Sequence, residues 1–267
     1  MAVFNLFFAS ILLPLIGIAL LARRTRIPLA GWIATFLLSL GLTSFSFFTA
    51  PWGWFGIAPR YILGVLFLLA LAVSLIRKPP EEPGSETPLA QIVKVVIALF
   101  FGGVAIGALQ GRSVPPGAVD FAFPLRHGTY LVEHGGSTPP TNIYAAIQQQ
   151  HFAVDLVKLN AWGMRAHGIV PSDPKAFAIY GEPVYAPCDG SVSAIAANIV
   201  TLQCGDLAVH LAPLSAVSVK PKSPIAKGTL LGNAGVILHL YAQRGNDAVP
   251  MTFGGRWLVR NETVRVP

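Results

Sequence analysis

Three histidines and one aspartate in the second half of the chain have the residue types and surroundings of a metal site. His151 and Asp155 stand in the segment His-Phe-Ala-Val-Asp, His210 in Val-His-Leu and His239 in Ile-Leu-His-Leu-Tyr. Two imidazoles and one carboxylate are a sufficient set of protein ligands for a catalytic zinc ion, which keeps its fourth position open for water. These residues therefore include enough ligands for Zn²⁺.

The elements that must position these residues have the pattern of β-strands. Short apolar runs separated by Gly and Pro predict an all-β or β-rich domain. Since side chains alternate across a strand, His151 and Asp155 are expected on one face, and His239 on one face with Ile237 and Tyr241. The polar faces of three strands can then converge on a metal ion. The predicted strands are Phe152–Val157, Pro183–Ala186, Ser191–Ala194, Ile199–Gln203, Leu207–Leu211, Val217–Val219, Thr229–Leu231 and Val236–Ala242.

The first part of the chain has the composition of a membrane anchor. Hydrophobic residues make up 53% of the chain and charged residues only 12%, and the mean hydropathy is +0.60. A membrane-spanning helix needs about 20 mostly apolar residues. Four runs approach or reach that length, so we expect a bundle of four transmembrane helices over residues 1–112, a linker over 113–124 and the β-domain over 125–267. The runs are Val3–Leu21, Ala30–Ala50, Tyr61–Leu75 and Gln91–Leu109.

The distribution of basic residues predicts the orientation of these helices. The cluster Arg23–Arg26 follows the first run, and cytoplasmic loops are enriched in Lys and Arg. This places both ends of the chain, and the whole β-domain, on the extracytoplasmic side of the membrane. The net charge of the chain is +7, and its excess basic residues flank hydrophobic segments. They form no basic patch interleaved with aromatic residues, so nucleic acid is not an expected partner.

The order of several motifs over about residues 120–260 resembles the lysostaphin/LytM-type zinc metallopeptidases, which cleave peptide cross-bridges in bacterial cell walls. The resemblance implies an antiparallel β-sheet domain with a groove across it. It also implies that His151, Asp155 and His239 are zinc ligands, that His210 lies beside the metal-bound water, and that Asn142 and Tyr144 line the groove. The matching segments are His151-x-x-x-Asp155, Gly181-Glu-Pro-Val-Tyr-Ala-Pro-Cys-Asp-Gly-Ser-Val192, His210-Leu-x-x-Leu-Ser, Ile225-Ala-Lys-Gly-Thr-Leu-Leu-Gly-Asn-Ala-Gly235 and Leu238-His-Leu-Tyr-Ala242.

The chain departs from the family pattern at the residue that acts on the water. Ile237 stands where the family has the first histidine of its His-x-His motif, and the loops at Ala196–Ile199 and Gly232–Val236 are short. Two hypotheses follow. One is a zinc endopeptidase acting on peptidoglycan or peptide cross-bridges, with weak or lost activity. The alternative is a non-catalytic LytM-like module that activates another cell-wall hydrolase. A lipoyl-like carrier hairpin is a third interpretation, but it leaves His151 and Asp155 unexplained.

Cys188 and Cys204 are the two cysteines of the chain. In an oxidising compartment they can form a disulfide, and the alternative is a pair of small buried hydrophobic residues.

Overall fold

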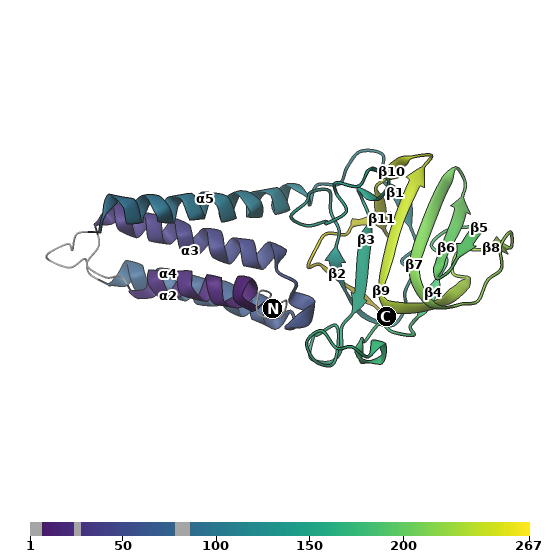
Figure 1. Cartoon of the computed structure of the whole chain (residues 1–267), viewed down its shortest axis with the longest axis horizontal. Helices are drawn as coiled ribbons and strands as arrows, with labels where there is room; N and C mark the ends of the chain where they lie inside the picture. Colours follow the sequence, from purple (N-terminus) through teal and green to yellow (C-terminus); the bar gives the residue numbers. More distant parts are fainter. Residues whose placement is uncertain (1–6, 24–27, 78–85) are drawn as a thin grey trace. The chain divides into compact units, whose positions relative to one another are not determined.

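The computed structural model describes residues 7–23, 28–77 and 86–267, and the chain divides into two compact units (Figure 1). The first unit comprises Met1–Trp52 and Ile57–Gly107, and the second comprises Gly53–Gly56 and Ala108–Pro267. The short segment Gly53–Gly56 therefore belongs to the second unit although it lies between helices of the first. Residues 113–124, expected to be a linker, contain a strand of the second unit.

Three helices of the first unit start at or next to a proline. Pro28 precedes α3, Pro59 lies in the first turn of α4 and Pro88 begins α5. Proline suits a helix N-terminus because the first N–H groups of a helix have no acceptor within the helix, so the absence of the proline N–H costs no hydrogen bond. The helices are α2 (Leu13–Arg23), which continues from the π-helical turn η1 (Phe8–Leu12), α3 (Leu29–Thr49), α4 (Ala58–Ile76) and α5 (Pro88–Gln110), with the 3₁₀ turn η2 (Trp52–Trp54) following α3.

Three helices of the described residues, α3, α4 and α5, are long and apolar enough to span a membrane. The first predicted run starts outside the described residues, and its described part is a shorter apolar helix, Phe8–Arg23. The prediction of four spans is thus supported for three helices. Most of the basic cluster Arg23–Arg26 also lies outside the described residues, so the orientation stays a prediction.

The second unit is built from two sheets, and the larger one is antiparallel throughout. Its strand order is β13-β2-β3-β9-β7-β6-β5-β8, with β4 and β10 also pairing with β9. The smaller sheet has the order β1-β11-β12 and one parallel pair, β1 with β11. The mostly antiparallel β-domain expected from the sequence is confirmed at this level. The strands are β1 (Val119–Phe121), β2 (Gly128–His134), β3 (Val154–Lys158), β4 (Pro183–Tyr185), β5 (Gly190–Ala196), β6 (Ile199–Cys204), β7 (Leu207–Val217), β8 (Pro224–Ile225), β9 (Leu230–Arg244), β10 (Asp247–Val249), β11 (Met251–Phe253), β12 (Arg256–Trp257) and β13 (Thr263–Val266).

The central strand β9 joins two strands that the sequence predicts as separate. Residues 232–235 stay extended between them and pair with β4 on one side and β7 on the other. This continuity requires glycine at position 232, where φ is +155° and a Cβ atom would lie 2.0 Å from the carbonyl oxygen of Ala216. A single 15-residue strand therefore runs through the centre of the sheet.

The alternation of side chains along β7 and β9 separates the core from the candidate site. Leu238, Leu240 and Ala242 are buried in the core, whereas His239 and Tyr241 are half-buried on the other face. Cys188 and Cys204 form a disulfide, which joins the segment before β5 to the end of β6.

Candidate functional site

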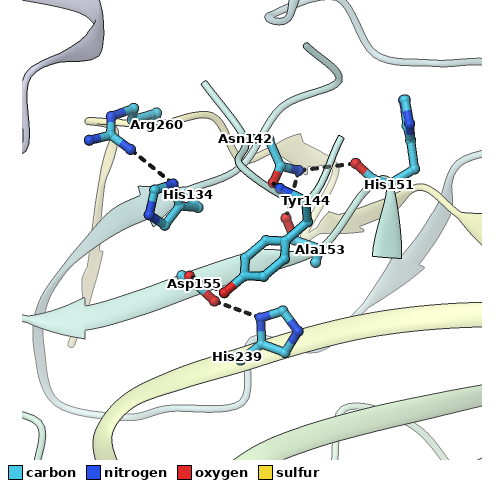
Figure 2. A network of polar contacts seen from close by, with 8 residues as sticks. All are labelled: His134, Asn142, Tyr144, His151, Ala153, Asp155, His239 and Arg260. Atoms are coloured by element: carbon cyan, nitrogen blue, oxygen red, sulfur yellow. Dashed lines mark hydrogen bonds and ion pairs between the residues drawn. The ribbon is translucent and has the colours of Figure 1, made fainter. Parts of the chain in front are cut away.

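Asp155 and His239 are hydrogen-bonded to each other at the centre of the candidate site. The antiparallel pairing of β3 with β9 places these residues directly opposite each other, between two core pairs. His239 Nδ1 lies 2.7 Å from Asp155 Oδ1, and the Asp155 side chain is only 2% exposed. Since a carboxylate only accepts hydrogen bonds, His239 Nδ1 carries the proton that it donates to Asp155 (Figure 2).

Tyr144 occupies the second oxygen of the same carboxylate. Its hydroxyl donates to Asp155 Oδ2 at 3.1 Å, and its ring centre lies 4.5 Å from that of His239. Burial and the neighbouring Asp155 charge raise the pKa of Tyr144, so the phenol remains protonated and a donor near neutral pH. Both Asp155 oxygens therefore accept hydrogen bonds from within the protein.

Asn142 fixes the segment that carries Tyr144. The Asn142 side chain is completely buried; its amide nitrogen lies within 3.1 Å of the carbonyl oxygens of Gly136, His151 and Ala153, and its Oδ1 accepts from the Tyr144 N–H (Figure 2). A buried amide that satisfies several backbone groups is costly to replace. The polar pair expected to line the groove is thus a structural support of the site.

His134 lies beside this network, although the sequence analysis does not single it out. An irregularity in β2 after Val132 places His134 opposite Asp155. Its Nδ1 accepts a hydrogen bond from the guanidinium of Arg260 at 2.9 Å. Burial, together with the Arg260 charge, lowers the pKa of His134 to about 4, so its imidazole is neutral near pH 7. Because a local shift in pairing creates this contact, strand alternation alone does not reveal it.

His151 does not join Asp155 and His239. It follows the 3₁₀ turn η3 (Gln148–Gln150) with helical backbone angles, and β3 begins only at Val154. The expected alternation from residue 151 to 155 therefore does not extend to His151, whose ring packs on that of Phe152 at 4.5 Å. Figure 2 shows the His151 ring directed away from Asp155 and His239.

The predicted zinc ligands consequently do not fit a zinc ion as they are placed. Two of the three, Asp155 and His239, are adjacent, but the described residues contain no group of three or more His, Cys, Asp or Glu side chains that could hold a metal ion. In addition, Asp155 Oδ1 and His239 Nδ1, two atoms that could bind a metal ion, are hydrogen-bonded to each other.

His210, the predicted catalytic histidine, lies on β7 opposite Tyr241 of β9. The two rings stack with centres 4.3 Å apart, and His210 Nδ1 lies 3.1 Å from the Thr201 hydroxyl. Burial, and then the nearby His239, lowers the pKa of His210, which favours the neutral form. Its Nε2 is buried and has no hydrogen-bond partner among the described residues.

Together these side chains form a face of aromatic rings and imidazoles. Tyr144, His210 and Tyr241 offer ring surfaces, and Ile237 adds an apolar side chain on the face of β9 that carries His239. Each oxygen of Asp155 accepts one hydrogen bond from a neighbouring side chain. Such ring surfaces can pack against the side chains of a peptide.

Comparison with known proteins finds no matching family model and no matching curated protein sequence. Solved structures with M23 peptidase or LytM-like domains are similar at low identity. Csd3 from Helicobacter pylori is 16% identical with a TM-score of 0.35, covering 59% of this chain and 38% of its own. A putative M23 peptidase from Pseudomonas aeruginosa is 24% identical with a TM-score of 0.26, covering 28% of this chain and 39% of its own.

The third similar structure is the SpoIIQ–SpoIIIAH pore-forming complex, which is 16% identical with a TM-score of 0.26 over 36% of this chain and 58% of the matched chain. The chain therefore spans less than two thirds of the length of each of these proteins.

Proposed function

We propose that this protein is a membrane-anchored LytM-like module that binds peptide without hydrolysing it. Three features support the proposal: the order of the LytM-type motifs in the sequence, the apolar helices that precede the β-unit, and a site whose carboxylate is engaged within the protein. The β-unit would present the face of β7 and β9 to its ligand.

The observation that carries this proposal is the closed set of contacts around Asp155. Its two oxygens accept hydrogen bonds from His239 and Tyr144, and His151 lies outside the set. Ile237 further removes the side chain that would act on a water molecule, because an alkyl group cannot accept a proton. Hydrolysis would require both a rearranged carboxylate and a replacement base.

The ligand in this proposal is a peptidoglycan stem or cross-bridge peptide, or a second cell-wall hydrolase that the module activates. The anchor would place the β-unit outside the cytoplasm of a bacterial inner membrane, with four spans and both ends external. A reporter enzyme that works only outside the cytoplasm, fused after Pro267, is expected to be active. Activity of a cytoplasm-only reporter at the same position would contradict this topology.

Cosedimentation with insoluble peptidoglycan tests the binding proposal. The detergent-solubilised full chain is expected to sediment with the polymer and to release no soluble peptide fragments, with or without a chelator. Tyr241→Ala should weaken binding, because it removes the ring that stacks on His210. Tyr180→Ala removes an exposed tyrosine elsewhere on the unit and is the matched control. Chelator-sensitive release of fragments by the unaltered protein would overturn the proposal.

A zinc endopeptidase is the second candidate, and two observations favour it. Asp155 and His239 are already adjacent, and His210 Nε2 has no partner among the described residues. In this alternative His151 joins them as a ligand and His210 handles the proton. Cleavage that Ile237→His increases, and that His151→Ala abolishes, would support it.

A further inference from the structure

The loop between α3 and α4 is part of the β-unit. Residues Gly53–Gly56 cluster with Ala108–Pro267, whereas the flanking residues belong to the helical unit. The chain thus passes between the units after Trp52, after Gly56 and after Gly107. A single flexible linker would join two domains only once.

Arg165 contacts this loop through both its backbone and its side chain. Its backbone N–H donates to the carbonyl oxygen of Gly53 at 2.7 Å. Its guanidinium carbon lies 4.5 Å from the centre of the Trp54 ring, and Phe177 completes the contact with its ring 5.9 Å from that of Trp54. A cation over an indole face is a favourable contact, and it strengthens when water is excluded.

The same guanidinium reaches both strands that carry the candidate site. Arg165 Nη1 pairs with Glu133 Oε2 at 3.1 Å, and both side chains are 8% exposed. Arg165 Nη2 donates to the carbonyl oxygen of Val236 at 3.4 Å. Glu133 immediately precedes His134 in β2, and Val236 immediately precedes Ile237 in β9. Arg165 therefore connects the loop to the residues next to the site.

The loop fits closely against its surroundings. A Cβ atom at Gly53 would lie 3.1 Å from Leu131 and 3.2 Å from the Glu133 carboxylate. At Gly56, where φ is +85°, it would lie 3.1 Å from the carbonyl oxygen of Trp162. Since these distances are short for a Cβ contact, a shift of Gly53 toward these side chains would move them as well.

We propose that Arg165 is a positioning residue for strands β2 and β9 and that the loop Gly53–Gly56 sets its position. A change in the arrangement of α3 and α4 would move Trp54 and, through Arg165, alter the mobility of Glu133–His134 and Val236–Ile237. The candidate site would then respond to the state of the membrane helices. This inference holds whether the site binds or hydrolyses its ligand.

Hydrogen–deuterium exchange of the full chain in lipid nanodiscs tests the inference. Trp54→Ala is expected to raise the local opening of peptides covering 131–136 and 234–239 about 5- to 30-fold, the effect of losing a desolvated cation–π contact. The β5–β6 hairpin should exchange as before. Trp54→Phe retains an aromatic face and should lie close to the unaltered protein. Trp162→Ala, which removes a tryptophan that is 82% exposed, is the matched control and should change nothing at the site.

Unchanged exchange at 131–136 and 234–239 in Trp54→Ala would overturn the inference. An equal rise in the β5–β6 hairpin would also overturn it, because Trp54 would then support the unit as a whole. If Trp54→Ala does not fold, Arg165→Lys supplies the test. It keeps the charge but loses the planar fork that reaches both strands, and it should give the same local pattern.

Discussion

At the scale of single residues, the candidate site consists of the side chains that contact Asp155, chiefly His239 and Tyr144. Strand alternation correctly predicts that His239 and His210 lie on the face of their strands opposite the core, because β7 and β9 are regular at these positions. The same rule does not place His151, since a 3₁₀ turn precedes β3, and it does not find His134, since an irregularity in β2 brings it to Asp155. Local deviations of this kind depend on tertiary contacts that the sequence pattern does not carry.

Asn142 is expected to be the most sensitive polar residue of the site. Asn142→Ala removes an NH2 group whose two hydrogens serve three carbonyl oxygens, two of them in fully buried contacts, and each buried acceptor that loses its donor costs about 1–3 kcal/mol. The thermal midpoint of the β-unit should therefore fall by several degrees, as monitored by circular dichroism of the full chain. Asn198→Ala, in the exposed β5–β6 turn, is the control and should leave the midpoint in place. Equal midpoints for both variants would show that the Asn142 contacts contribute little.

The lowered pKa of His134 predicts a pH dependence of stability. Its folded-state pKa is about 4, below the ordinary value of 6.5, because the site is buried and Arg260 is adjacent. As pH falls from about 6.5 to about 4, the unfolded chain binds a proton that the folded chain does not, so the free energy of unfolding decreases. Below about pH 4 this contribution is lost completely.

Thermal melts across this pH range give the measurement. His134→Gln should reduce the slope of stability against pH, because glutamine does not titrate. The remaining slope reports other groups, including His210, whose pKa is shifted in the same direction. A slope identical to that of the unaltered protein would mean that the pKa of His134 is the same in the folded and the unfolded chain.

At the scale of elements, β9 is the strand that organises the unit. It pairs with β3, β4, β7 and β10, and it presents Ile237, His239 and Tyr241 on one face. The sequence predicts its two halves but not their union, because Gly232-Asn-Ala-Gly235 has the composition of a turn. The pairing partners on both sides keep this segment extended.

Gly232→Ala is expected to destabilise the unit severely. The added methyl group would lie 2.0 Å from the Ala216 carbonyl oxygen, so β7 and β9 must separate locally. A loss above about 4 kcal/mol is expected for such a clash combined with a strained φ. Limited proteolysis should then cleave the variant within the β-unit. Gly245→Ala, where φ is also positive but the space is open, should remain resistant, and cleavage of both at the same rate would contradict the steric argument.

At the scale of the whole molecule, the chain combines apolar helices with a β-unit that also includes a loop from between those helices. Composition alone predicts the two parts, since the apolar residues are concentrated before Arg112 and the histidines come after it. It does not predict that Gly53–Gly56 belongs to the β-unit, because the contact of Trp54 with Arg165 joins residues more than a hundred positions apart. A fragment starting at residue 113 would lack this contact, so experiments on the site require the full chain.

Zinc stoichiometry of the purified full chain is the most direct test of the central claim, that Asp155 and His239 bond within the protein instead of holding a metal with His151. After incubation with excess Zn²⁺ and gel filtration, elemental analysis is expected to find far less than one zinc ion per chain, with no change in Asp155→Asn. One tightly held zinc ion per chain, lost in both His151→Ala and Asp155→Asn, would contradict the account.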